Sequence, residues 1–262
     1  MNAAQHTDSA PVALVTGASR GLGLALARAL AAEGWRLVIT ARGATALAGA
    51  AAELSALTKV VALPGSIVDD DHRAHLATAA DRLGGASLLI NNAGSLNGAA
   101  APGGEPLPRL ADFPLPDLLE LFEVNALAPI ALTQLVLPQL RDHAGALLNI
   151  SSDAAVEPYL GWGGYGASKA ALDQATAVLA REEPELRVWA VDPGSMRTEM
   201  LQEASPGEDI SGEPLPEQVA PLLLDLLHHR TPSGRYRAED LAALPAPGPA
   251  PASAPALGRG GR

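Results

Sequence analysis

Short apolar, β-branched runs alternate with longer amphipathic stretches along most of the chain, and this alternation limits the folds that the sequence can adopt. Strands are expected at residues 12–16, 37–40, 60–63, 87–90, 146–150 and 188–191. Nearly all their residues are apolar, as strands covered on both faces must be. Helices are expected between them at about 22–33, 44–57, 69–82, 116–142, 163–182 and 216–229. This order predicts an α/β fold with a doubly wound parallel sheet and helices on both faces.

The pattern also divides the chain into parts. A length of 262 residues fits one large domain or two small ones, and the alternation favours a single domain over residues 11–240. Residues 1–10 are expected to form a flexible N-terminus, and residues 245–262 a low-complexity, disordered tail of Ala, Pro and Gly. Two stretches without a clear period, 97–116 and 195–216, are expected to form a rim of the active site and a mobile lid.

Composition excludes several functions. The chain carries 18 basic and 29 acidic residues, a net charge of −11, and no basic run, so a nucleic-acid partner is not expected. No uninterrupted apolar run reaches the roughly 18 residues that span a bilayer, and the first residues do not resemble a signal peptide. With zero Cys the chain can form no disulfide or thiolate site. We therefore expect a soluble, cytoplasmic protein without a membrane partner.

A glycine-rich turn follows the first expected strand and precedes an Ala- and Leu-rich helix. Glycines at such a turn let the backbone approach a pyrophosphate, and the N–H groups of the helix N-terminus attract its charge. The alternative is a glycine turn that serves packing alone. The residues expected to bind a dinucleotide here are Gly17, Ser19, Arg20, Gly21, Leu22 and Gly23.

Tyr165 and Lys169 are four residues apart in an expected helix, so their side chains share one face. The chain has only three Tyr, and its only lysines are Lys59 and Lys169. A chance pair at this spacing is expected about 0.02 times per chain. Because a phenol with a pKa near 10 is a poor base at neutral pH, a neighbouring ammonium that favours the phenolate would activate it.

Together these motifs resemble the classical short-chain dehydrogenase/reductase family. The glycine spacing is T-G-x-x-x-G-x-G, Asn91-Asn92-Ala93-Gly94 follows the fourth strand, and the Tyr-x-x-x-Lys pair comes later. The resemblance spans about residues 11–240 and implies a single Rossmann-like domain. It also implies hydride transfer between a nicotinamide cofactor and a carbonyl or secondary alcohol carbon of a small molecule. A catalytically silent dinucleotide sensor or scaffold with the same fold is the alternative.

The resemblance assigns four catalytic residues. Tyr165 would be the general acid/base, and Lys169 would support it and hold the nicotinamide ribose. Ser151 and Ser152 both end the fifth strand, but Ser152 lies 13 residues before Tyr165, the family's usual spacing, and is chosen. Its alternative role is a strand-end hydroxyl bonded to backbone. Asn125 would hold a water that relays protons to Lys169.

The same resemblance implies further cofactor contacts. Ser66 and Ile67 stand where the family usually has Asp-Val beside the adenine, and so depart from its pattern. The segment Asp192–Thr198 resembles the P-G-x-x-x-T stretch beside the nicotinamide. The residues added by these matches are Ser66, Ile67, Asn92, Ala93, Gly94, Pro193, Gly194, Met196 and Thr198, together with Tyr165 and Lys169.

Charge at the end of the second strand indicates which cofactor binds. An acidic residue there would bond the ribose 2′-OH, whereas arginines attract a 2′-phosphate. The strand ends Ile39-Thr40-Ala41-Arg42 without an acid, and Arg20 lies within the glycine turn. NADP(H) is therefore favoured over NAD(H), with Arg20 and Arg42 as solvated surface charges the alternative.

Two further expectations concern metals and assembly. His72 and His75 are three residues apart and His228 and His229 are adjacent, but no further ligand is spaced to complete a site, so no metal is expected. The resemblance implies a homodimer or homotetramer, assembled through the helices near residues 126–142 and 163–182. Tyr159 and Trp162 beside Tyr165 suggest an apolar ligand surface, with core packing as the alternative.

Overall fold

The computed structural model describes residues 10–96 and 107–241. The expected tail at 245–262, nearly all of the expected flexible N-terminus at 1–10, and residues 97–106 of the expected rim lie outside the described residues.

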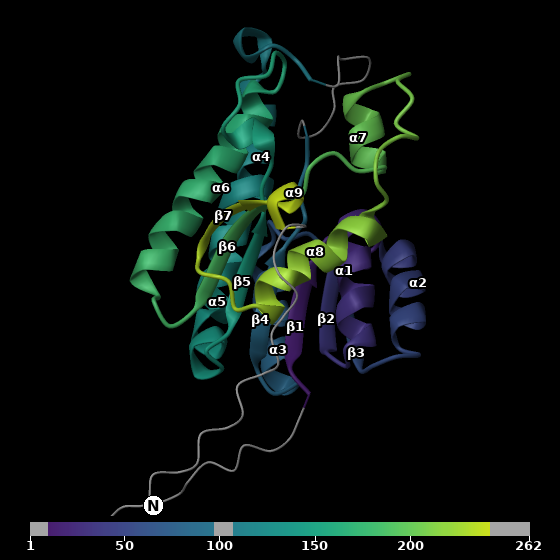
Figure 1. The fold of residues 1–262 in the computed structure, drawn as a ribbon, viewed down its shortest axis with the longest axis vertical. Coiled ribbons are helices and arrows are strands. Elements are labelled where there is room, and N and C mark those ends of the chain that lie inside the picture. The colour runs from purple at the N-terminus through teal and green to yellow at the C-terminus, as the bar shows by residue number, and fades with distance from the viewer. Residues whose placement is uncertain (1–9, 97–106, 242–262) are drawn as a thin grey trace, which may run out of the picture.

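A seven-stranded parallel sheet forms the centre of the molecule (Figure 1). Its strand order is β3-β2-β1-β4-β5-β6-β7, with every neighbouring pair parallel. The strands are β1 (Val12–Thr16), β2 (Arg36–Ala41), β3 (Val60–Pro64), β4 (Ala86–Asn91), β5 (Ala146–Ile150), β6 (Arg187–Asp192) and β7 (Gly234–Arg237). The predicted fold class and six predicted strands are confirmed. The sequence analysis missed β7, a four-residue edge strand that contains two arginines.

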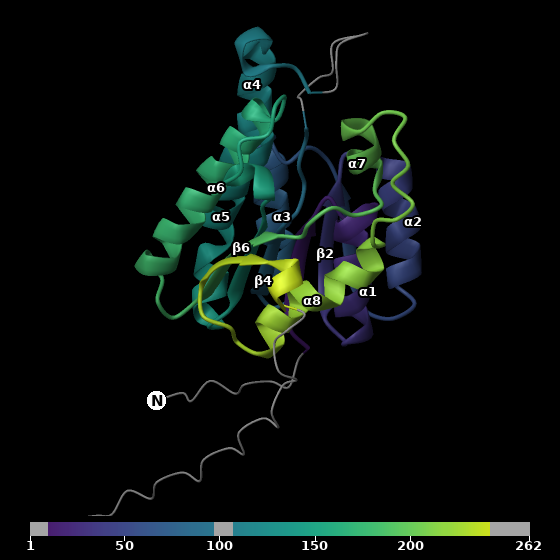
Figure 2. The same ribbon diagram turned by 45° about the horizontal axis from the view of Figure 1, so that its top comes forward.

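Helices cover both faces of this sheet. The longer ones are α1 (Gly21–Ala32), α2 (Ala44–Leu54), α3 (Asp70–Arg82), α4 (Leu115–Phe122), α5 (Ala128–Asp142), α6 (Gly163–Glu182) and α8 (Pro216–His228). Two short helices, α7 (Glu199–Ala204) and α9 (Ala238–Leu241), complete the set. The expected lid at 195–216 therefore contains one short helix, α7. In both views α4 and α7 extend past the same end of the sheet (Figures 1 and 2).

Successive strand residues point to opposite faces, which gives the molecule two cores. Val15 packs with residues of α1, α2 and α8, whereas its neighbour Leu14 packs with residues of α3 and α5. Because both sides of each central strand are buried, alternation with polar residues is absent. Burial on both faces therefore explains why the strands are continuous apolar runs in the sequence.

The expected helix at 116–142 is interrupted by a π-helical turn. Glu123–Leu127 adopts this wider turn between α4 and α5, and its Asn125 is fully buried. The run Leu115–Asp142 is long and apolar enough by composition to cross a membrane, which the apolar-run argument had not anticipated. Its apolar window is 44% buried within the protein, where α5 packs on the sheet.

The carboxyl ends of the parallel strands meet at one edge of the sheet. Ligands of open α/β sheets bind in the crevice outside this edge, where the strand order reverses. Here β1 and β4 are neighbours at that reversal. The glycine turn follows β1, and the segment Asn92–Gly94 follows β4, so the fold brings the sequence motifs to a common place.

Candidate active site

The glycine turn after β1 packs closely against the residues that follow β4. Gly17 has a φ of +67°, and a Cβ there would lie 2.8 Å from Asn92 Nδ2. At Gly23 a Cβ would lie 2.4 Å from both Asn92 Nδ2 and the Gly17 oxygen. Asn92 Nδ2 itself donates to the Thr16 carbonyl at 2.9 Å. Only hydrogen fits at these two glycine positions, and this lets the turn pass directly beside β4.

The start of α1 faces this turn without a capping side chain. Arg20 is the N-cap residue, and it makes no side-chain cap hydrogen bond. The Leu22 side chain is buried in the core, so only its backbone can reach a ligand. The close turn and the uncapped helix start fit the pyrophosphate of a dinucleotide.

Asn125 lies in the π turn, and its side chain makes three hydrogen bonds to residues outside that turn. Its Oδ1 accepts from the Ser95 backbone N–H at 2.9 Å, and its Nδ2 donates to the Ser95 oxygen at 2.8 Å. A third contact joins Nδ2 to Ser168 Oγ at 3.0 Å. These bonds tie the segment after β4 to α6, which carries Tyr165 and Lys169.

Lys169 lies in the same buried region. Its Nζ donates to the Ile150 carbonyl at 2.8 Å and is 5.6 Å from the centre of the Tyr165 ring. A Cβ on Gly94 would lie 3.2 Å from Asn125 Oδ1 and 3.7 Å from Lys169 Nζ. Burial lowers the pKa of Lys169 to about 8, although the charge of Asp173 opposes this. The Lys169 ammonium is therefore retained at pH 7 by a narrow margin.

Burial raises the pKa of Tyr165 above its ordinary value, which a hydrogen bond with the Ser152 side chain partly opposes. The negative charges of Asp153 and Asp192 raise this pKa further. The sequence analysis expected the Lys169 ammonium to shift the phenol toward phenolate, and that expectation is wrong for this structure. Desolvation dominates because the phenol is buried, and Tyr165 is held as a proton donor.

The structure separates the two candidate serines. The Ser152 side chain lowers the pKa of Tyr165, and its Oγ donates to Asp153 Oδ1 at 3.0 Å. Ser151 is buried, and its hydroxyl has no hydrogen-bond partner in the part of the chain that the structure describes. The geometry thus favours Ser152 as the hydroxyl that acts beside Tyr165.

The segment after β6 runs from Asp192 to the start of α7, where it approaches the glycine turn. Asp192 Oδ1 accepts from the Gly194 backbone N–H at 2.9 Å, which shapes the Pro193-Gly194 turn. Thr198 caps α7 by accepting from the Leu201 N–H at 3.2 Å. The Thr198 methyl group lies 3.8 Å from the position of a Cβ on Gly21. The end of this segment therefore lies beside the glycine turn.

The profile of the short chain dehydrogenase family matches residues 11–209. The chain belongs to the short chain dehydrogenase family. It is 33% identical over 214 residues to a serine 3-dehydrogenase of Agrobacterium fabrum, covering 81% of this chain and 82% of that one.

Solved structures agree with this assignment. An alcohol dehydrogenase of the archaeon Thermococcus sibiricus, complexed with 5-hydroxy-NADP, is 26% identical with a TM-score of 0.77, covering 87% of this chain and 96% of that chain. A short chain dehydrogenase of Shigella flexneri, complexed with NADP, is 26% identical with a TM-score of 0.78, covering 88% and 98% of the two chains. The protein is thus an NAD(P)-dependent oxidoreductase.

Four other predicted cofactor residues of this short chain dehydrogenase lie at three places. Arg20 lies at the start of α1, Arg42 follows β2, and Ser66 and Ile67 follow β3. Arg20 forms an ion pair with Glu199, the first residue of α7, a partner that the sequence analysis did not anticipate. Arg42 is exposed after β2. The Ile67 side chain is buried, and its carbonyl accepts from Arg73 at 2.6 Å. Ser66 is half-buried. Within the described ranges no group of three or more His, Asp or Glu residues could hold a metal ion.

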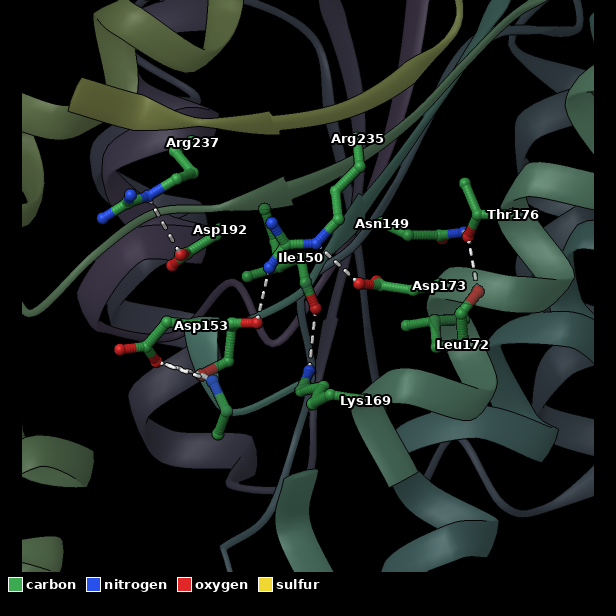
Figure 3. A network of polar contacts seen from close by, with 12 residues as sticks. Asn149, Ile150, Asp153, Lys169, Leu172, Asp173, Thr176, Asp192, Arg235 and Arg237 are labelled. Atoms are coloured by element: carbon green, nitrogen blue, oxygen red, sulfur yellow. Dashed lines mark hydrogen bonds and ion pairs between the residues drawn. The ribbon is translucent and has the colours of Figure 1, made fainter. Parts of the chain in front are cut away.

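Two charged residues near Lys169 and Ser152, Asp173 and Arg235, were not predicted as part of the site of this short chain dehydrogenase. Arg235, in β7, donates from Nε to Asp173 Oδ2 at 2.9 Å and from Nη2 to the Ser152 carbonyl at 2.8 Å (Figure 3). Asp173 lies one turn after Lys169 in α6. The i, i+4 spacing of Lys169 and Asp173 was a signal available in the sequence, but nothing near Arg235 pointed to its partners.

Proposed function

We propose that this protein is an NADP(H)-dependent oxidoreductase that acts on a carbonyl or secondary alcohol carbon of a small molecule, with Tyr165 as general acid/base. One observation carries the proposal. Asn125 bonds Ser168 on α6, Lys169 lies 5.6 Å from the centre of the Tyr165 ring and bonds the Ile150 carbonyl, and the Ser152 side chain lowers the pKa of Tyr165, and these contacts support the four-residue site. A scaffold that only bound a dinucleotide would not need a buried proton donor at this position.

The four side chains have distinct tasks in this proposal. A bound nicotinamide cofactor supplies the hydride. Ser152 donates a hydrogen bond to the substrate oxygen, and Tyr165, which burial keeps protonated, delivers the proton. Lys169 stabilises the negative charge left on the Tyr165 oxygen and holds the ribose. Asn125, fixed by Ser95, supports the return of a proton toward Lys169.

The cofactor would lie along the carboxyl edge of the sheet, within a domain that spans residues 11–240. The pyrophosphate would meet the turn and the first N–H groups of α1, and the adenine would meet Ser66 and Ile67. The segment after β6 would face the carboxamide. The residues proposed for these contacts are Gly17, Ser19, Gly21, Leu22, Gly23, Ser66, Ile67, Asn92, Ala93, Gly94, Pro193, Gly194, Met196 and Thr198.

A preference for NADP(H) rests on charge. β2 ends at Ala41 without an acidic residue, and Arg20 and Arg42 are exposed near that end. Either guanidinium could bind a 2′-phosphate with paired hydrogen bonds. The NADP complexes among the similar solved structures support this preference.

Aromatic packing at Tyr165 supports a proposal about the class of substrate, and exposed apolar side chains support a proposal about assembly. The Trp162 ring contacts the Tyr165 ring edge-on with centroids 5.6 Å apart, and supports an apolar or aromatic substrate. Leu127, Leu135 and Val178 are exposed in the helical segments near residues 126–142 and 163–182, and would be covered in a homodimer or homotetramer. The cysteine-free sequence supports a cytoplasmic location.

A binding and turnover experiment tests the proposal. NADPH and NADH are titrated into the protein by nicotinamide fluorescence, and cofactor oxidation is followed with a panel of small ketones and aldehydes. We expect tighter binding of NADPH, and carbonyl reduction that Tyr165→Phe lowers by at least about 100-fold. Tyr236→Phe is the matched control, because the Tyr236 hydroxyl bonds the Pro232 carbonyl instead. Cofactor binding without turnover of any carbonyl would support the sensor alternative.

A further inference from the structure

One arginine outside the recognised motifs connects three elements of the catalytic region. Arg235 lies in the edge strand β7, Asp173 lies in α6, and Ser152 follows β5 (Figure 3). The guanidinium bonds both partners, at 2.9 Å to Asp173 and 2.8 Å to the Ser152 carbonyl. The Asp173 side chain is only 13% exposed, so this ion pair is shielded from water and from salt.

The partners of Arg235 lead directly to two catalytic groups. The Ser152 carbonyl belongs to the residue whose side chain lowers the pKa of Tyr165. Asp173 acts on Lys169, because its negative charge raises the pKa of that lysine against the effect of burial. In addition, Lys169 bonds the Ile150 carbonyl, two residues before Ser152. Two cations from different elements thus hold the backbone where it leaves β5.

We propose that Arg235 is a positioning residue, which fixes the Ser152 backbone and neutralises Asp173 so that Ser152 and Lys169 keep their places beside Tyr165. A planar guanidinium suits this task, because it makes both bonds at a fixed mutual geometry that an ammonium cannot reproduce. The inference rests on the proposed function for the roles of Ser152 and Lys169. The contacts themselves do not depend on it.

Other charges near this group act mainly on the tyrosine. Asp153, after β5, and Asp192, at the end of β6, both raise the pKa of Tyr165. Arg237 lies two residues beyond Arg235, with Nε 4.0 Å from Asp192 Oδ2, and also pairs with Glu239. On α6 itself, Tyr165 and Asp173 are the ionisable neighbours of Lys169. Asp173 therefore faces two cations: Arg235, which bonds it directly, and Lys169, whose pKa it raises. The positive charge of Arg235 also lowers the pKa of Asp192.

Because the chain has only two lysines, the charge of Lys169 can be measured directly. In protein labelled with ¹³C-lysine, the two side chains give two titrating NMR signals, and exposed Lys59 serves as the internal control. Arg235→Gln removes the cation that bonds Asp173 directly, so the Asp173 charge acts more fully on Lys169 and we expect the pKa of Lys169 to rise by about 0.5 to 1. Asp173→Asn removes the negative charge and should lower this pKa. The Lys59 signal should titrate unchanged in both variants.

Kinetics with the carbonyl substrate test the effect on Ser152. We expect Arg235→Gln to lower kcat about tenfold or more and to change the Kd for NADPH much less, because the substrate-oxygen donor is displaced while the glycine turn is not and the ribose loses only part of its support. The matched control is Arg141→Gln, which removes an arginine that pairs with Glu183 at the far end of α6. Glu183 lies about 21 Å along the helix from Lys169. The control should leave kcat and the pKa of Lys169 unchanged.

The proposal is overturned if Arg235→Gln lowers thermal stability alone, with kcat and the Lys169 titration as in the native protein, because Arg235 would then be only a structural brace. It is also overturned if both variants move the pKa of Lys169 in the same direction. Should Arg235→Gln fail to fold, Arg235→Lys keeps the positive charge but cannot make both bonds at the same geometry, so a native kcat in that variant overturns the proposal. The titration needs no substrate, so opposite shifts without turnover of any carbonyl would reject the proposed function and keep this inference.

Discussion

The two halves of the site use different materials. Around the ends of β1 and β4, the site is formed mainly by backbone groups, namely the glycines and an uncapped helix start. The Asn92 side-chain amide adds to them, and almost no charge is buried there. Around the ends of β5, β6 and β7, it places buried or half-buried charges, namely Lys169, Asp173, Asp192 and Arg235. The first half depends on room for a ligand. The second depends on the balance of opposing charges in a region of low dielectric constant.

This difference predicts how each half fails. Where only hydrogen fits, a single methyl group is destructive, whatever the charge. Where opposite charges balance, a substitution that keeps the shape of a side chain but removes its charge is harmful, because the charge of its partner is left uncompensated. Steric changes should therefore affect cofactor binding, and charge changes should affect the rate and its pH dependence.

The largest effect is expected from Gly23→Ala. A Cβ would lie 2.4 Å from the Gly17 oxygen and from Asn92 Nδ2, so the turn must move away from β4. Overpacking of this kind costs about 1–3 kcal/mol, and we expect NADPH binding to weaken about 100-fold and the Tm to fall. Fluorescence titration and thermal unfolding measure both.

Gly49→Ala is the matched control for that variant. Gly49 lies within α2 with nothing within 4 Å of its added Cβ. Replacement of a helical glycine by alanine should stabilise the fold by up to about 1 kcal/mol and leave NADPH binding unchanged. Normal NADPH binding by Gly23→Ala would contradict the steric account of the first half.

A pH profile tests the charge balance of the second half. Burial lowers the pKa of Lys169 from 10.5 to about 8. If the ammonium is required, kcat/KM for carbonyl reduction should be level below this pH and fall about tenfold per pH unit above it. In Lys169→Met the remaining activity should lack this descending limb. A native profile that stays level to pH 10 would show that the ammonium is not needed.

The same pKa has a consequence for stability. Between pH 8 and 10.5 the unfolded chain holds the Lys169 proton more tightly than the folded chain does. The Lys169 contribution to the free energy of unfolding therefore rises with pH across this window, and its burial cost is present in full below it. Urea unfolding at several pH values should show this rise in the native protein but not in Lys169→Met.

The smallest effect is expected at the contact that joins α7 to the cofactor half. Arg20 is paired with Glu199, and both side chains are more than 60% exposed. A 2′-phosphate would compete with this carboxylate, so Glu199→Gln should tighten NADPH binding by a few-fold, about the value of an exposed ion pair, and leave NADH binding unchanged. Equal changes for both cofactors would mean that Arg20 does not meet the 2′-phosphate.

Local motifs could be recognised from the sequence and long-range contacts could not, for a physical reason. Gly17, Gly21 and Gly23 form one local pattern, and Tyr165 and Lys169 share one helix turn, so short-range spacing carries the information. The bond between Arg235 and Ser152 joins positions 83 residues apart, and the one between Arg235 and Asp173 spans 62. Such contacts depend on strand order, and β7 is too short and too polar to be recognised by periodicity.

The Arg20–Glu199 pair was missed for a related reason. The segment after β6 has no regular period, so nothing in it indicated that α7 begins against the glycine turn. The expected pKa direction of Tyr165 was wrong because composition reports which charges exist, and not how far each is desolvated. Burial of the phenol, with the charges of Asp153 and Asp192, raises its pKa.

The π turn at Glu123–Leu127 sets the rotational phase between two helices. A π turn accommodates one residue more than an α-helical turn, and each α-helical residue turns the chain by about 100°. Loss of one residue here would restore a regular helix. It would also rotate α4 about its axis relative to α5, carrying the exposed Leu115 and Leu119 to another side of the molecule. The extra residue that places Asn125 beside Ser95 therefore also determines which way the outer surface of α4 faces.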